Sequence, residues 1–147
     1  MILGIGGPPG AGKEQVGKIF EKYGFEYCSR DNLKERKNNF DSEKNYVVVP
    51  IIKKKDLEIF SNLEEFNFIF VHADRKYRYK RWGEKIKIQP WKWKTYSQFV
   101  HYEKFSKDFL NIAYKKNKYY SIKNDSSKEN LELKILDVLK KIKSKGQ

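Results

Sequence analysis

Cysteine and histidine are scarce in this sequence, and their scarcity excludes several kinds of site. The single cysteine, Cys28, cannot form a disulfide within the chain or build a cysteine-based zinc site. The two histidines, His72 and His101, have no metal-ligand partner at a useful spacing, so we expect both to be structural. No serine-nucleophile motif is present either. A solitary thiol fits a reducing compartment, and we expect the protein in the cytoplasm.

Long apolar runs are also absent. The apolar start, residues 1–5, lacks a basic leader, and no later run approaches the roughly 20 apolar residues of a membrane span. We therefore expect a soluble protein with no membrane partner. The 147 residues, 39% of them hydrophobic, suffice for one core and are too few for two, so we expect a single domain over residues 1–147. The oligomeric state stays open.

Acidic residues are fewer than basic ones. The chain has 32 Lys and Arg residues against 19 Asp and Glu residues, which gives a formal charge of +13. A surface of this sign attracts polyanions such as nucleotides, nucleic acid or anionic lipid. A skewed genomic base composition explains the excess lysine equally well, so the charge by itself does not identify a ligand.

Short apolar runs alternate with amphipathic segments, a pattern typical of an α/β sheet. The first run is apolar on both faces, as a buried parallel strand should be. Pro50 has no N–H to donate to a neighbouring strand, so the third strand is expected to end or bend there. Strands are expected over residues 2–5, 25–28, 46–52, 66–73 and 119–123.

The amphipathic segments predict helices. The first helix has Val16, Ile19, Phe20 and Tyr23 on one face and ends at Gly24. Residues 83–94 are expected to form an irregular loop. Further helices are expected up to Arg36, over 56–63, over 75–82 after a cap at Asp74, over 96–116, and at the end of the chain, where one face carries Leu131, Ile135, Val138, Leu139 and Ile142. Together the segments predict a three-layer α/β domain with a mostly parallel five-stranded sheet.

A glycine-rich motif lies directly after the first strand. Residues 7–13 read Gly-Pro-Pro-Gly-Ala-Gly-Lys and satisfy G-x-x-x-x-G-K, the Walker A pattern of phosphate-binding loops. Glycines let the main-chain N–H groups turn inward around a phosphate, the following helix offers its positive end, and Lys13 reaches the β and γ oxygens. A turn that merely joins strand and helix is the alternative. The expected nucleotide-binding residues are Gly7, Pro8, Pro9, Gly10, Ala11, Gly12, Lys13, Glu14 and Gln15, with ATP as the ligand.

Glu14 departs from the usual pattern, which has Ser or Thr after the lysine to bind Mg²⁺. A carboxylate is also an oxygen ligand for Mg²⁺, directly or through water. We therefore expect Glu14 to take part in metal binding. The alternative is a first-turn acid that the helix dipole favours by about 0.3–1 kcal/mol.

With these residues, the chain resembles the P-loop nucleoside-monophosphate kinase superfamily, and within it the small deoxynucleotide monophosphate kinases and dephospho-CoA-kinase-like proteins. Residues 7–25 resemble the loop and first helix of that family, which implies the P-loop NTPase fold. Residues 74–81 resemble its arginine-bearing helix leading into a lid, which is expected over about 75–95. Residues 119–125 resemble its closing strand and turn on the adenine side. The likeness spans nearly the whole chain, but only the loop is a specific motif.

The resemblance implies transfer of the γ-phosphoryl group from ATP to a (deoxy)nucleoside monophosphate or related nucleotide. Lys13, with the loop amides, would hold the donor. Arg78 and Arg81, three residues apart on one helix face, would supply guanidinium groups to the phosphates. A basic solvated helix face is the alternative for these two arginines.

The acceptor side matches less well. Asp31, Lys34 and Arg36 stand where the family binds the acceptor monophosphate, though an ordinary surface helix also explains them. The acid that family members usually have at the end of the third strand is replaced by Pro50, followed by two lysines. Asp56 and Asp74 are possible substitutes for it.

Two other functions remain open. A degenerate kinase would bind ATP without turnover. A basic nucleic-acid-binding module is suggested by the aromatic residues interleaved with cations in residues 77–82 and 91–94, which could stack on bases and neutralise phosphates.

Overall fold

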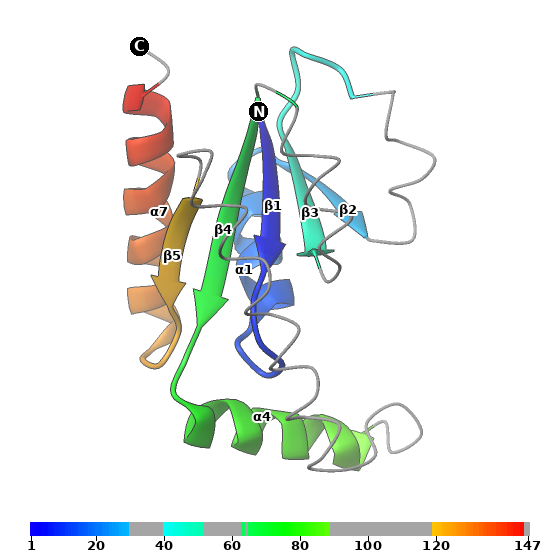
Figure 1. Ribbon diagram of the computed structural model, residues 1–147, viewed down its shortest axis with the longest axis vertical. Coiled ribbons are helices and arrows are strands. Elements are labelled where there is room, and N and C mark those ends of the chain that lie inside the picture. The colour runs from blue at the N-terminus through cyan, green and yellow to red at the C-terminus, as the bar shows by residue number, and fades with distance from the viewer. Residues whose placement is uncertain (30–39, 52–62, 64, 89–118, 146–147) are drawn as a thin grey trace.

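A five-stranded parallel sheet forms the centre of the computed structural model, which describes residues 1–29, 40–51, 63, 65–88 and 119–145 (Figure 1). The strand order is β2-β3-β1-β4-β5, and all four pairings are parallel. The strands are β1 Ile2–Gly6, β2 Glu26–Ser29, β3 Tyr46–Ile51, β4 Phe66–His72 and β5 Tyr119–Lys123. The predicted α/β class and five-stranded sheet are confirmed.

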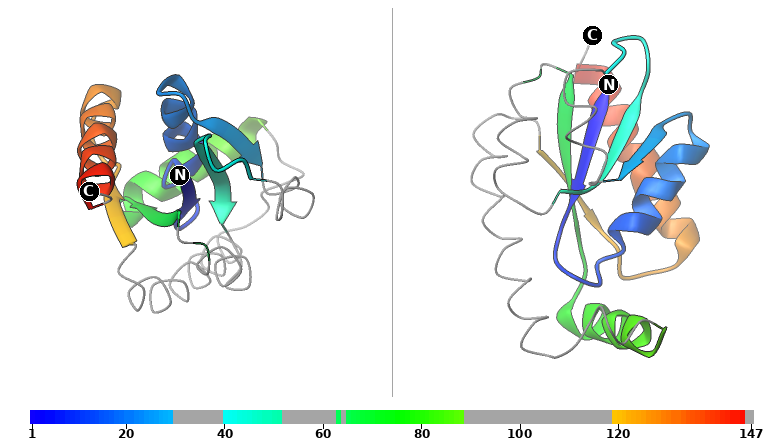
Figure 2. Two further views of the ribbon diagram at one scale, coloured as in Figure 1. Left: turned by 90° about the horizontal axis from the view of Figure 1, so that it is seen from above. Right: turned by 90° about the vertical axis from the view of Figure 1, so that its right-hand side faces the viewer.

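Helices α1 (Lys13–Lys22) and α7 (Lys128–Lys145) cover one face of this sheet, as the two views of Figure 2 show. Helix α4 (Arg75–Ile88) lies across the carboxyl ends of the strands (Figure 1). Because the carboxyl ends of parallel strands share one edge, the segments after β1, β4 and β5 meet beneath the sheet, next to α4.

The main core lies between the sheet and the two helices on that face. It contains Leu3 and Ile5 of β1, which alternate with residues of the opposite face, as the period of a strand requires. Burying a side chain of this size contributes about 1.5–3 kcal/mol. The five apolar residues predicted to form one face of the last helix are all buried in this core: Leu131, Ile135, Val138, Leu139 and Ile142.

The opposite face of the sheet carries larger rings. Gly4 of β1 faces Phe66, whose ring atoms would lie 2.7 Å from an added Cβ, and Gly6 faces Phe68 in the same way at 2.8 Å. The small residues of the central strand therefore make room for the phenylalanines of β4. These rings form a second cluster with residues of β1, β2 and β3.

The ends of β3 and α4 test two expectations about element boundaries. Strand β3 was expected over 46–52 with an end or a bend at Pro50; it continues through Pro50 to Ile51, and a register shift in its pairing with β1 between Gly4 and Gly6 agrees with a bend there. Helix α4 does not end at Trp82 but continues to Ile88, so residues 83–88 are helical where an irregular loop was expected.

Other expectations fall outside the described residues. These are the helices predicted up to Arg36, over most of 56–63 and over 96–116, the remainder of the loop at 89–94, and the acceptor-side candidates Asp31, Lys34, Arg36 and Asp56. Within the part of the chain that is described, no helix is both long and apolar enough to cross a membrane.

Candidate phosphate-binding site

The glycine-rich loop runs from Gly7 to Gly12 at the carboxyl end of β1, the middle strand of the sheet (Figure 1). Gly10 and Gly12 have φ values of 77° and 92°, in the left-handed region that glycine adopts without strain. Helix α1 begins at the next residue, Lys13, so its positive end faces the loop. The predicted order of strand, loop and helix is therefore present.

The loop is packed tightly on its outer side. A Cβ at Gly10 would overlap the carbonyl oxygen of Arg78 in α4, and a Cβ at Gly12 would overlap the side-chain amide of Asn124. A Cβ at Gly7 would overlap the carbonyl oxygen of Val71. The glycines are thus required by their neighbours on β4, α4 and the β5–α7 turn, as well as by the turning of the chain.

Lys13 folds back over the loop that precedes it. Its Nζ donates a hydrogen bond of 2.9 Å to the carbonyl oxygen of Gly7, in a partly buried position. The ammonium group therefore lies beside the loop, within reach of an anion held there.

Of the two arginines predicted to contact phosphate, Arg78 is buried and bonds to the segment before α4, and Arg81 bonds to the loop. Arg78 is 7% exposed, and its Nε donates to the Ala73 carbonyl at 2.8 Å. Arg81 donates from Nη1 to Gly10 O at 3.2 Å and from Nη2 to Asn124 O at 2.7 Å. The alternative of a solvated basic face is therefore wrong for Arg78.

Asn124 belongs to the site, although the sequence indicated only a turn at this position. It is 5% exposed, and its Nδ2 donates to the Ala11 carbonyl at 2.9 Å. Its main-chain N–H donates to His72 O at 2.7 Å. One available signal was a side-chain amide placed directly after the last strand, at the edge where the strands of an α/β sheet bind ligands.

A pocket of about 630 Å³ opens beside the loop, between α1, α4 and the start of α7. Its volume is in the usual range for small-molecule sites. Four cationic side chains and two carboxylates border it, an excess of positive charge that favours an anionic ligand. The lining residues are Gly10, Gly12, Glu14, Gln15, Lys18, Ile19, Lys22, Arg81, Glu84 and Lys128.

Glu14 is exposed in the first turn of α1 and borders this pocket. The negative charge of Glu14 also acts on Tyr27. Burial, and after it the charges of Glu14 and Glu21, raise the pKa of the Tyr27 hydroxyl. Among the residues described, no three His, Cys, Asp or Glu side chains gather to hold a metal ion. Mg²⁺ commonly takes one or two protein carboxylates and completes its shell with phosphates and water, so Glu14 fits that role only together with a bound nucleotide.

The other candidate acid, Asp74, stands between β4 and α4. Its carboxylate lies 3.8 Å from Nζ of Lys123, which also pairs with Asp125 at 3.2 Å. The negative charge of Asp74 is therefore partly compensated by a lysine at the end of β5.

No protein-family model matches this chain. No curated protein is similar to it in sequence.

Solved structures do match it along nearly their whole length. TT1252 from Thermus thermophilus has a TM-score of 0.62 at 15% identity, with 96% of this chain and 97% of that chain covered. A shikimate kinase from Acinetobacter baumannii, in complex with shikimate, has a TM-score of 0.58 at 20% identity, with 94% of this chain and 92% of that chain covered. A deoxyadenosine kinase from M. mycoides, with dCMP and dCDP bound, has a TM-score of 0.57 at 15% identity, with 98% of this chain and 99% of that chain covered. The chain therefore has the fold of the P-loop kinases.

Proposed function

We propose that this protein is an ATP-dependent nucleotide kinase, which transfers the γ-phosphoryl group of ATP to a (deoxy)nucleoside monophosphate or a related nucleotide. The observation that carries the proposal is the loop of residues 7–12. It lies between a buried strand and a helix N-terminus, and Lys13 folds over it. The fold shared with kinases that act on small molecules supports the same reaction class.

The donor is expected to lie with its phosphates in the loop. The N–H groups in the first turn of a helix have no partner within that helix and are suited to bind an anion. Lys13 would exchange the Gly7 carbonyl for the β and γ oxygens. The base and ribose would occupy the pocket bordered by Gln15, Lys18 and Lys128.

In the transfer, an oxygen of the acceptor phosphate forms a bond to the γ-phosphorus, and the bond from that phosphorus to the β-phosphate oxygen breaks, so ADP leaves. Negative charge spreads over the γ oxygens, and the protein accelerates the step by position and charge. Lys13 is the proposed catalytic cation at the loop. Arg81 adds positive charge at the pocket wall, and Arg78 fixes the start of α4 through its bond to Ala73.

Mg²⁺, when bound with the nucleotide, neutralises charge on the β- and γ-phosphates. Glu14 is the residue that we propose to hold it, directly or through water. Residues 1–147 would act as one domain, with α4 as the first part of a lid-like segment that extends to about residue 95. The buried thiol of Cys28 fits a reducing compartment, and we place the reaction in the cytoplasm.

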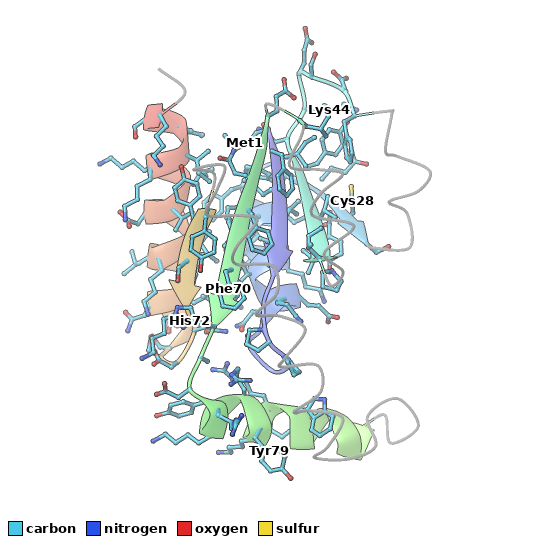
Figure 3. The ribbon with its side chains drawn as sticks, in the orientation of Figure 1. Met1, Cys28, Lys44, Phe70, His72 and Tyr79 are labelled. Atoms are coloured by element: carbon cyan, nitrogen blue, oxygen red, sulfur yellow. The ribbon has the colours of Figure 1, made fainter. Side chains whose placement is uncertain are left out.

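A turnover assay with ATP, Mg²⁺ and a panel of nucleoside and deoxynucleoside monophosphates plus dephospho-CoA tests the proposal. Lys13→Ala should lower kcat/KM on the order of 10²–10³-fold, the usual effect of removing a charge-stabilising donor. Lys44→Ala is the matched control, because Lys44 is exposed at the end of the sheet opposite α4 (Figure 3).

Three outcomes would count against parts of this proposal. Unchanged kinetics in Lys13→Ala would remove Lys13 from the mechanism. ATP binding without product from any acceptor would favour the degenerate kinase. A wild-type protein that fails to bind ATP would overturn the proposal as a whole.

A second candidate, binding of single-stranded nucleic acid, is favoured by exposed tyrosines on α4. Tyr77 and Tyr79 are 40% and 44% exposed, Nζ of Lys76 lies 5.1 Å over the ring of Tyr77, and Tyr79 points away from the sheet (Figure 3). Trp82 is 1% exposed and belongs to the core, so it is not available to stack on a base. The salt dependence of single-strand affinity separates this candidate from the kinase.

A further inference from the structure

We propose that Asn124 and Arg81 are positioning residues, which set the main-chain orientation of the phosphate loop by holding two of its carbonyl groups on the outer side. This inference rests on the proposed function and deepens it, because it assigns the control of anion binding to two residues outside the loop.

Asn124 determines the direction of one peptide group. Its Nδ2 holds the carbonyl oxygen of Ala11 at 2.9 Å. In a trans peptide the C=O and the following N–H point in opposite directions, so the N–H of Gly12 is directed away from Asn124. Asn124 is itself fixed, since it is buried and its own N–H is bonded to His72 O at the end of β4.

Arg81 connects the same turn to the neighbouring peptide of the loop. One guanidinium nitrogen donates to Gly10 O and another to Asn124 O, at 3.2 and 2.7 Å. A planar guanidinium offers donors at fixed angles, whereas a lysine ammonium is a single point charge. Arg81 therefore joins α4, the β5–α7 turn and the loop, segments that are far apart in the chain.

The consequence for anion binding follows from the chemistry of the peptide group. If the Ala11 carbonyl lost its partner and rotated inward, a partial negative charge would replace an N–H at the site of the phosphate. A phosphate held by inward N–H groups would then be repelled. Loss of Asn124 or Arg81 should therefore weaken anion binding specifically, beyond any loss of stability.

The first experiment measures the affinity of the full chain for tripolyphosphate and for ATP by calorimetry. Tripolyphosphate has no base or ribose, so it reports on the phosphate contacts without those of the nucleoside. Asn124→Ala should weaken binding of both ligands by the same factor, about tenfold or more, as expected when a buried hydrogen bond that orients the site is lost. Asn130→Ala, at an exposed position in the first turns of α7, is the matched control and should change either affinity less than about twofold.

The second experiment needs no ligand. The chain has nine glycines, so protein labelled with ¹⁵N-glycine gives a simple amide spectrum. Asn124→Ala should shift the resonances of Gly10 and Gly12 and leave that of Gly24, at the far end of α1, in place. Arg81→Lys should do the same while keeping the charge and the buried asparagine. Arg75→Lys, on the exposed first turn of α4, is its control.

Wild-type tripolyphosphate affinity in folded Asn124→Ala and Arg81→Lys would overturn the inference. Loss of ATP affinity with unchanged tripolyphosphate affinity would also overturn it, because it would assign these residues to the base. If the wild-type protein binds neither ligand, the kinase proposal fails, and the glycine resonances then decide the inference alone: unmoved Gly10 and Gly12 signals would refute it. If Asn124→Ala does not fold, Arg81→Lys supplies both measurements.

Discussion

His72, at the carboxyl end of β4, shows how position alters the chemistry of one side chain (Figure 3). Its Nε2 lies 2.9 Å from the hydroxyl of Ser121, and its ring stacks on Phe70 at 6.2 Å. Burial first, and then the positive charge of Lys123, lower the pKa of His72, against a weaker opposite effect of Asp125. The folded protein therefore favours the neutral imidazole.

This shift predicts a loss of stability in mild acid. Below the ordinary histidine pKa of about 6.5, the unfolded chain takes up a proton at this residue more readily than the folded chain, so the free energy of unfolding falls with pH. The contribution is present above about pH 6.5 and is lost as the pH falls toward the lower pKa of the folded state. Urea denaturation at about pH 7.5 and 5.5 should show a smaller loss for His72→Gln than for the wild type. His101 is present in both proteins, so its contribution to the pH dependence cancels in the comparison.

Equal losses in the two proteins would contradict this assignment of the pKa shift. They would place the acid sensitivity in carboxylates or in His101.

Single residues of the candidate site were predictable from the sequence only where they belong to a local sequence pattern. Lys13 and the loop glycines follow from a seven-residue spacing after a strand. The contacts of Arg81 and Asn124 do not, because they join residues 71 and 113 positions apart, and no periodicity encodes a pairing at that distance. The sequence placed Arg81 on the correct helix but could not give its partners.

At the scale of elements, the loop depends on α4 lying directly against it. Gly10 and Gly24 both have positive φ, 77° and 89°, but differ in surroundings. A Cβ at Gly10 would overlap the main chain of Arg78, whereas a Cβ at Gly24 would meet nothing within 4 Å. A comparison of the two glycines therefore distinguishes the cost of backbone strain from the cost of close packing between elements.

Alanine at these two positions should give unequal costs. Gly24→Ala should lower the free energy of unfolding by about 1–2 kcal/mol, the cost of the left-handed conformation alone. Gly10→Ala should cost about 1–3 kcal/mol more, because α4 must move away from the loop. Chemical denaturation of both variants measures the difference. Equal destabilisation would mean that α4 moves away from the loop without lowering the free energy of unfolding, so that the packing between them is loose.

Elements with a strong local pattern were predicted well. Strand β5 has the expected bounds, and the buried face of α7 has the expected residues, because both elements pack through a regular repeat. The end of α4 was not predicted, because Gly83 and the lysines that follow it are typical of a loop. In the structure Gly83 lies within the helix, with open space beside it. At Pro50 the segment alone allowed either an end or a bend of the strand, and its pairing with β1 decides for continuation to Ile51.

At the scale of the whole molecule, the charge of +13 should produce some binding to any polyanion at low salt. Because log affinity falls linearly with log salt, such binding weakens steeply. We expect the affinity for a single-stranded oligothymidine, measured by fluorescence anisotropy, to be lost between about 50 and 200 mM salt. Phosphates enclosed by the loop, as in ATP, should lose far less affinity over that range.

Retained oligonucleotide affinity at the higher salt would contradict this expectation. If Tyr77→Ala and Tyr79→Ala then removed that affinity, base stacking on α4 would be supported and the nucleic-acid candidate would gain over the kinase. Tyr23→Ala is the matched control, because Tyr23, directly after the end of α1, is a similarly exposed tyrosine, 38% exposed.

The strand order has a consequence for how this protein is made. β1 pairs with β3 on one side and β4 on the other, and both of these strands follow it in the chain. On the ribosome the first strand can pair with β3 once residue 51 has emerged, but it lacks its other neighbour until residue 72 has emerged. The glycine-rich turn at its end therefore gains its contact with β4 only in the second half of translation, and its last support, the bond from Asn124, arrives with residue 124.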